Sequence, residues 1–236
     1  MDKLIRGLLH YRKNELPKRR EMFAQLAKGQ DPDTLFLACA DSRVVPNLLA
    51  SQEPGDLFTI RTVGNLIAPA GSDGAAIGDV SEAAAVEYAL LALRVSDIVV
   101  CGHSHCGAMK AAYEKKSVPG AKNLDAWLQH AVPSVDRALA ARHIDHSLPM
   151  VEQLSQVNVL QQIDHLRTYG VVREREERGD LRLHAWWFDV GTGETHVFDS
   201  AHGGFVMLDD EVAERIAKHS VPAPRLSFEA VAPKSP

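Results

Sequence analysis

Three side chains that bind soft metals follow short apolar runs of the sequence. Cys39 ends the run that begins at Thr34, and His103 and Cys106 come just after the run 96–101. Two thiolates and one imidazole can hold a metal ion and leave its fourth position open, which is typical of a catalytic zinc site rather than a structural one. The long separation between Cys39 and His103 excludes a zinc finger, whose ligands lie close together in sequence.

The alternative for the cysteines is ordinary burial, because free cysteine is among the most buried residue types. The nearby histidine and the two strand ends together favour a metal site. We expect His103 rather than His105 to be the ligand, because a spacing of three lets one helical turn present His103 and Cys106 together. His105 is then expected to be a polar lining residue, and Cys101 a core cysteine with no chemistry.

Asp41 and Arg43 directly follow Cys39 and allow two interpretations. The pair is either a surface ion pair of little consequence, or an aspartate that Arg43 holds beside the metal. In the second interpretation Asp41 accepts a hydrogen bond from metal-bound water, and it could displace that water if it swung inward. The position of the pair directly after Cys39 favours the second interpretation.

The elements around these residues alternate between strand and helix, as in a βαβ fold with a buried parallel sheet. In such sheets, ligands bind beyond the carboxyl ends of the strands, where the strand order reverses, so Cys39 and His103 could meet at one edge. Asp79 and Glu82 predict a capping box for the first of the inner helices. Strands are predicted over 34–40, 56–61, 96–101, 181–190 and 195–199, and helices over 83–93 and 108–116.

The sequence predicts one α/β domain over 1–236, with a mostly parallel sheet of four to five strands and helices on both faces. Residues 1–28 form an N-terminal helical arm of two helices broken near Pro17, which packs on its own chain or on a partner subunit. Residues 125–178 are expected to be mostly helical. The proline-rich segment 221–236 is expected to be a flexible tail.

Composition limits the partners. A net charge of -5 argues against a general nucleic-acid binder, which needs a basic surface. No apolar stretch approaches the roughly 20 residues of a membrane helix, and no secretory signal is apparent at the start, so we expect no membrane contact. Three cysteines are too few for a secreted disulfide framework, and a cytoplasmic location is expected.

Two separated motifs carry a resemblance to a known family. Cys39-x-Asp41-Ser42-Arg43 together with His103-x-x-Cys106-Gly107 resembles the two signatures of β-class carbonic anhydrases. The similarity is close from about Gln25 to Ala112 and looser elsewhere. It includes the segments 53–58, 61–65, 87–88 and 95–100.

The resemblance implies one zinc ion per subunit, held by Cys39, His103 and Cys106, with Asp41 and Arg43 as the activating dyad. It implies reversible hydration of carbon dioxide to bicarbonate and a proton by zinc-bound hydroxide. Two alternatives stay open: hydrolysis of a related electrophile such as carbonyl sulfide or carbon disulfide, and a zinc-stabilised binding protein without turnover. None of the eleven histidines is identified as a proton shuttle.

The resemblance also implies a substrate pocket. Gln30 and the backbone N–H of Gly107 would bind bicarbonate, while Phe58, Val63 and Tyr88 would line the carbon dioxide pocket. In that family the glutamine and part of the lining come from the neighbouring subunit. We therefore expect a homodimer or a higher even-numbered homo-oligomer.

Several positions depart from the family pattern. Thr62 and Ala40 stand where Asn and Ser are common, without changing a chemical role. In the bicarbonate-regulated branch a Trp precedes the first Cys by three residues, and here that position is Phe36. The Tyr of the same regulatory pocket aligns with Phe188. The resemblance is therefore to the plant-type, open-site branch.

Overall fold

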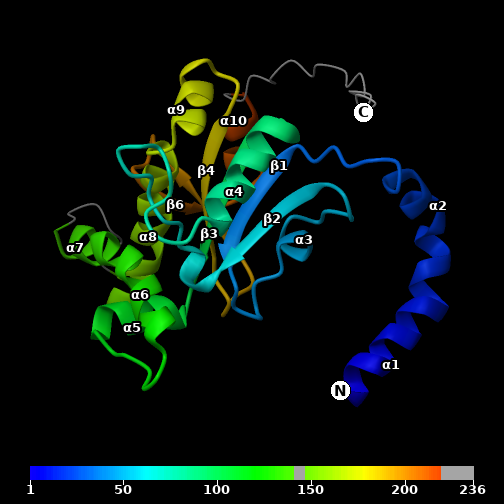
Figure 1. Ribbon diagram of the computed structural model, residues 1–236, viewed down its shortest axis with the longest axis horizontal. Helices are drawn as coiled ribbons and strands as arrows, with labels where there is room; N and C mark the ends of the chain where they lie inside the picture. The colour runs from blue at the N-terminus through cyan, green and yellow to red at the C-terminus, as the bar shows by residue number, and fades with distance from the viewer. Residues whose placement is uncertain (141–146, 219–236) are drawn as a thin grey trace, which may run out of the picture.

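The structure, a computed structural model, describes residues 1–140 and 147–218 and is built around a six-stranded sheet (Figure 1). The strand order is β2-β1-β3-β4-β5-β6, with parallel pairing from β2 to β4 and antiparallel pairing from β4 to β6. The mostly parallel α/β sheet is confirmed, but it has more strands than the expected four to five. The strands are β1 (Thr34–Cys39), β2 (Leu57–Thr62), β3 (Asp97–His103), β4 (Arg182–Phe188), β5 (Thr195–Asp199) and β6 (Gly204–Met207).

The chain reverses its direction of winding between β1 and β3. From β1 it crosses to β2 on one side and then to β3 on the other, so that Thr34 pairs with both Leu57 and Asp97. The carboxyl ends of β1 and β3, where Cys39 and His103 stand, are therefore neighbours at a switch point of the sheet.

Alternating side chains of the strands enter two different apolar clusters. Leu35 and Leu37 face α4 (Ser81–Glu87), α8 (Met150–Arg167) and α9 (Gly170–Glu177), whereas Phe36 lies on the opposite face. On that opposite face the partly buried Leu49 of α3 (Pro46–Leu49) joins the cluster. Burial of each large apolar side chain contributes about 1.5–3 kcal/mol, so both clusters hold the strands in register.

Helix α8 lies unusually close to β3. A Cβ atom added at Gly102 would stand only 2.6 Å from Cγ2 of Val159 and 3.2 Å from the carbonyl oxygen of Ser155. Gly102 immediately precedes His103, so its missing side chain lets α8 pack directly beneath the end of the strand. The first half of α8 also packs with α5 (Gly107–Glu114), α6 (Lys122–Leu128), η4 (Gln129–Ala131) and α7 (Val132–Ala140).

The N-terminal arm is one continuous helical run that stands off from the sheet (Figure 1). It comprises α1 (Asp2–His10), the π-helical turn η1 (Tyr11–Glu15) and α2 (Leu16–Leu26), and none of its residues is buried. The arm contains the two expected helices, but the expected break near Pro17 is wrong, because the π-helical turn η1 connects them without a gap and Pro17 lies in the first turn of α2. Leu4, Ile5, Leu8 and Leu9 form an exposed apolar stripe.

The capping box expected at α4 is also wrong. Asp79 accepts a hydrogen bond from the backbone N–H of Ser81 and makes a turn before the helix. Glu82 does not reach back; it is buried and accepts from the N–H of Ala68 at 3.3 Å. The helix then continues into a π-helical turn, η3 (Tyr88–Ala92).

Two other expectations concern the ends of the chain and membranes. The predicted flexible tail over 221–236 lies outside the described residues. Within the described ranges, no helix combines the length and the apolarity that crossing a bilayer demands.

Candidate metal centre

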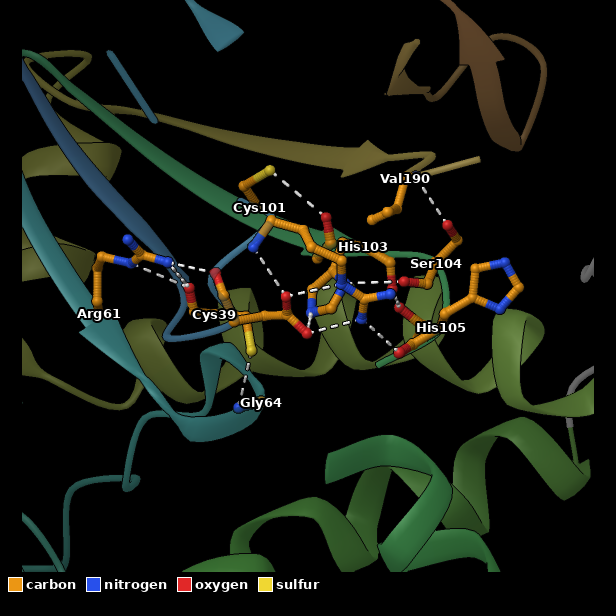
Figure 2. Close-up of polar contacts among 12 residues, drawn as sticks. Cys39, Arg61, Gly64, Cys101, His103, Ser104, His105 and Val190 are labelled. Atoms are coloured by element: carbon orange, nitrogen blue, oxygen red, sulfur yellow. Dashed lines mark hydrogen bonds and ion pairs between the residues drawn. The ribbon is translucent and has the colours of Figure 1, made fainter. Parts of the chain in front are cut away.

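The structure brings together the three side chains expected to bind a metal. Cys39 is the last residue of β1, His103 is the last residue of β3, and Cys106 immediately precedes α5. One ligand atom from each lies within 4.8 Å of the others, and all three residues are buried. Figure 2 shows Cys39 and His103 converging from adjacent strands.

The polar contacts of these residues fit a metal ion. His103 Nδ1 is 2.8 Å from the carbonyl oxygen of Ser104, which can only accept, so the proton sits on Nδ1. The other nitrogen, Nε2, is left as a buried acceptor that has no hydrogen-bond partner in the described chain. A buried acceptor without a partner is costly, and a soft divalent cation would satisfy it.

The two thiols shift each other's pKa in opposite directions. A hydrogen bond from Cys106 lowers the pKa of Cys39 below that of a free thiol, whereas the same bond, together with burial, raises the pKa of Cys106. The two shifts belong to the pair rather than to either residue. One thiolate is thus ready for a cation, and binding the cation would release the remaining proton.

Backbone groups hold the first cysteine. Sγ of Cys39 accepts a hydrogen bond from the N–H of Gly64 at 3.3 Å (Figure 2). Gly64 has a φ of +75°, and a Cβ there would lie 2.9 Å from Cβ of Ala108. The Arg61 guanidinium donates to the carbonyl oxygens of Cys39 and Asp41, at 2.9 and 2.6 Å. Arg61 was missed as a site residue because nothing local in the sequence indicates carbonyl partners at the end of β1 and in the loop after it.

Asp41 and Arg43 form a two-pronged ion pair beside this cluster. Arg43 donates from Nε to Oδ1 at 2.9 Å and from Nη2 to Oδ2 at 2.7 Å, and its backbone N–H adds a third bond. The hydrogen bonds from Arg43 hold the pKa of Asp41 well below its usual range, so the carboxylate is ionised. Oδ2 lies 4.0 Å from Nε2 of His103, which leaves the ion pair at the edge of the metal-binding group.

The connection between His103 and Cys106 is not the helical turn that the spacing suggested. His105 adopts a φ of +55° and turns the chain sharply, and α5 begins only after Cys106. The side chain of His105 is exposed, while its backbone N–H donates to the buried carboxylate of Glu152. His103 therefore ends β3 and Cys106 precedes α5, and the turn at His105 connects the two ligands.

A stripe of polar residues on α8 supports the site from below, and the sequence interpretation missed it. Their spacing of three to four residues was visible, but polar residues at that spacing usually mark the solvent face of a helix. Here each one bonds to the main chain of a site loop. Glu152 accepts from His105, Ser155 donates to the carbonyl oxygen of His103, Asn158 donates to that of Gly64, and Gln162 and His165 bond to Ile67.

Comparisons with known proteins agree with this geometry. The sequence model of the carbonic anhydrase family matches residues 34–195. The chain is 42% identical to a carbonic anhydrase of Synechocystis sp. over 209 residues, covering 87% of this chain and 74% of the relative. It is 41% identical to one from Pseudomonas aeruginosa, covering 88% and 92%. The solved β-carbonic anhydrase CcaA superposes with a TM-score of 0.80 at 39% identity, covering 88% of this chain and 99% of that one.

The chain belongs to the β-carbonic anhydrase family. It is an enzyme that interconverts carbon dioxide with bicarbonate and a proton. A further solved relative, a tetrameric β-carbonic anhydrase from Sordaria macrospora, has a TM-score of 0.70 at 27% identity and covers 84% of this chain and 95% of its own.

The residues expected to bind substrate fall into two groups. Gly107 is the first residue of α5, and Val63 is 43% exposed in η2 (Val63–Asn65), next to Gly64. Phe58 and Tyr88 pack together elsewhere, with ring centroids 5.7 Å apart. Thus only two of the five expected residues are adjacent to the chain's own metal-binding group.

The sheet register explains the separation of the second group. Phe58 pairs with Leu35, four residues before Cys39, which is about 13 Å along the strand. Gln30 precedes β1, on the far side of that strand from Cys39, and is exposed. A single chain therefore does not bring Gln30, Phe58 and Tyr88 to its own cysteines.

Phe36 and Phe188 lie together in the interior of the protein. Phe36 and Phe188 belong to one buried apolar cluster, and Phe36 stacks edge-on against Trp186 at 5.7 Å. Cys101 lies in the same cluster, and burial raises the pKa of its thiol to about 12, so it is a neutral core residue as expected.

Proposed function

We propose that Cys39, His103 and Cys106 hold one zinc ion per subunit and that carbon dioxide is hydrated there. The observation that carries the proposal is the convergence of three buried donor atoms within 4.8 Å, including an imidazole nitrogen without a partner. A bound zinc ion would lower the pKa of a water molecule and supply a hydroxide nucleophile near neutral pH.

The residues around the three donors orient the reactants. Asp41, held by Arg43, accepts a hydrogen bond from the attacking oxygen and aims its lone pair at the carbon atom. The backbone N–H of Gly107, at the start of α5, donates to an oxygen of bicarbonate, because the first N–H groups of a helix lack internal partners. Both roles require the reacting atoms to be held in a fixed orientation, which the rigid surroundings of Asp41 and Gly107 provide.

The second group of substrate residues is proposed to serve the partner subunit. Gln30, Phe58 and Tyr88 are displaced from the chain's own donors, and Tyr88 is 49% exposed, as expected for a surface that a second copy covers. The unburied arm, with its apolar stripe, supports the same arrangement. We therefore propose a homodimer, or a higher even-numbered assembly, as the catalytic unit.

We also propose that the chain belongs to the open-site branch. Asp41 is paired with Arg43 rather than directed to the metal donors, and the buried rings of Phe36 and Phe188 stand at the positions of the Trp and Tyr of the regulated branch. The proposed compartment is the cytoplasm, because the three cysteines are free thiols.

The experiment measures metal content and activity on one sample. We expect about one zinc ion per chain by atomic emission, stopped-flow hydration of carbon dioxide, loss of that activity on chelation, and its return when zinc is restored. Full activity in metal-free protein would refute the proposal, as would a full zinc complement without hydration activity.

A further inference from the structure

The turn between His103 and Cys106 is built around one strained residue. His105 has a φ of +55°, a left-handed conformation that side chains with a Cβ rarely adopt. Its backbone N–H and its carbonyl oxygen bond to two different residues. The N–H donates to both carboxylate oxygens of Glu152, at 3.1 and 2.9 Å. The carbonyl oxygen accepts from Nη2 of Arg43 at 3.0 Å. This turn therefore connects α8 to the ion pair beside the metal donors.

Glu152 depends on this turn for its own hydrogen bonds. The residue is 7% exposed, in the first turn of α8. In the described part of the chain, all of its carboxylate contacts go to His105: two to the backbone N–H and one to ring Nδ1 at 3.2 Å. A buried carboxylate is tolerated only when it is hydrogen-bonded, so the carboxylate and the strained turn hold each other in place.

We propose that Glu152 is a positioning residue that keeps Asp41 paired with Arg43; this inference rests on the proposed roles of those two residues. Nη2 of Arg43 bridges the carbonyl oxygen of His105 and Oδ2 of Asp41, at 3.0 and 2.7 Å. Oδ2 lies 4.0 Å from Nε2 of His103, so a small movement brings the carboxylate to the metal donors. Glu152 fixes the turn, the turn fixes Arg43, and Arg43 holds Asp41 away from the metal.

Two substitutions of Glu152 weaken its contact with the turn in different ways. Glu152→Gln keeps the volume but removes the charge and one acceptor oxygen. Glu152→Asp keeps the charge but is one methylene shorter, and so loses the contact with the turn. Arg43→Gln serves as the reference for a freed Asp41. The exposed Asp164→Asn on the same helix, which pairs with Arg137, is the matched control.

The readout is the visible absorption spectrum of the cobalt-substituted protein, which reports the donor atom in the fourth metal position. We expect both Glu152 variants to keep one metal per chain, to show the spectrum of Arg43→Gln, and to lose about tenfold in kcat, equivalent to about 1.4 kcal/mol. Asp164→Asn should keep the wild-type spectrum and rate. Adding Glu152→Gln to Asp41→Asn should leave the spectrum of Asp41→Asn unchanged, because no carboxylate remains to move.

Several results would overturn the inference. These are a wild-type spectrum and rate in Glu152→Gln, a wild-type spectrum in Glu152→Asp, loss of metal from either variant, or a spectral change that persists without the Asp41 carboxylate. The proposed role of Asp41 fails separately, when Asp41→Asn alone hydrates carbon dioxide at the wild-type rate. The single variants therefore show which of the two proposals is at fault.

Discussion

Replacing Asp41 by Asn tests the ion pair directly, and the structure sets the size of the effect. Arg43 makes three hydrogen bonds to the carboxylate, two of them from its guanidinium. An amide can accept from only one of the two guanidinium nitrogens and turns its own NH2 group toward the other. The amide is also neutral and so accepts more weakly from the attacking oxygen; losing a charge-assisted hydrogen bond to the reacting group costs about 1.5–3 kcal/mol, so we expect the rate of hydration to fall about 10- to 150-fold.

The same substitution should change stability little. Arg43 is 45% exposed, so solvent screening limits the contribution of the pair to the free energy of unfolding to about 1 kcal/mol or less. Because the folded pKa of Asp41 is lowered, this contribution is present above the unfolded pKa and disappears as the pH falls through the folded pKa. The stability difference between wild type and variant should therefore narrow on acidification below about pH 4.

Stopped-flow rates, zinc content and urea unfolding at several pH values measure these effects. Asp180→Asn, which removes a carboxylate from the exposed pair with Arg178, is the matched control and should leave the rate unchanged. Wild-type hydration by Asp41→Asn at full zinc occupancy would refute the reasoning. A stability difference that widened in acid would show that the pKa of Asp41 is not lowered in the folded state.

Three further predictions concern the metal, the pH profile and the arm. Cys106→Ser should lose most of its zinc and unfold at a lower temperature, because metal that binds only the native state stabilises it; full zinc content by atomic emission would contradict the ligand assignment. Stopped-flow rates should rise on the alkaline side of neutrality, because two thiolates neutralise the zinc charge and make its water less acidic than at a three-histidine site; a plateau below about pH 7 would contradict this. Bicarbonate should inhibit without cooperativity, because Phe36 and Phe188 are packed together; a sigmoidal inhibition curve would contradict this. Deleting residues 2–26 should shift the mass measured by light scattering toward a monomer and reduce activity; an unchanged mass would exclude the arm from the interface.

The metal-binding group was predictable because its signals are local. Cys39 and His103 end apolar runs, and parallel strands bring their carboxyl ends to one edge, so position in the sequence translated directly into position in space. The turn at His105 was not predictable, because its left-handed backbone is held by Glu152, a residue 47 positions away. A spacing of three residues fits a helical turn and a strained turn equally well.

Two other errors, at Glu82 and at β6, have different causes. Glu82 fits the capping-box pattern, yet the fold turns it inward to the N–H of Ala68. The four-residue β6 follows a turn closed by Gly203 and is too short to show an alternating pattern. For Glu82 the deciding partner lies 14 residues away, and local propensity contains no information about it; β6 pairs with its sequence neighbour β5, so its shortness alone hid it.

The polar stripe of α8 makes the length of this helix a functional constraint. Glu152, Ser155, Asn158, Gln162 and His165 lie on one side of the helix. The first two contact the turn after β3 and the last residue of β3, and the other three contact the segment after β2. Inserting one residue before Glu152 would rotate the whole row by about 100° relative to whatever precedes it. An insertion within the row would split it and release one half of the anchors at once. Substitutions on the outer surface of α8 are therefore expected to be tolerated, whereas insertions and deletions are expected to be tolerated only outside the segment from Glu152 to His165.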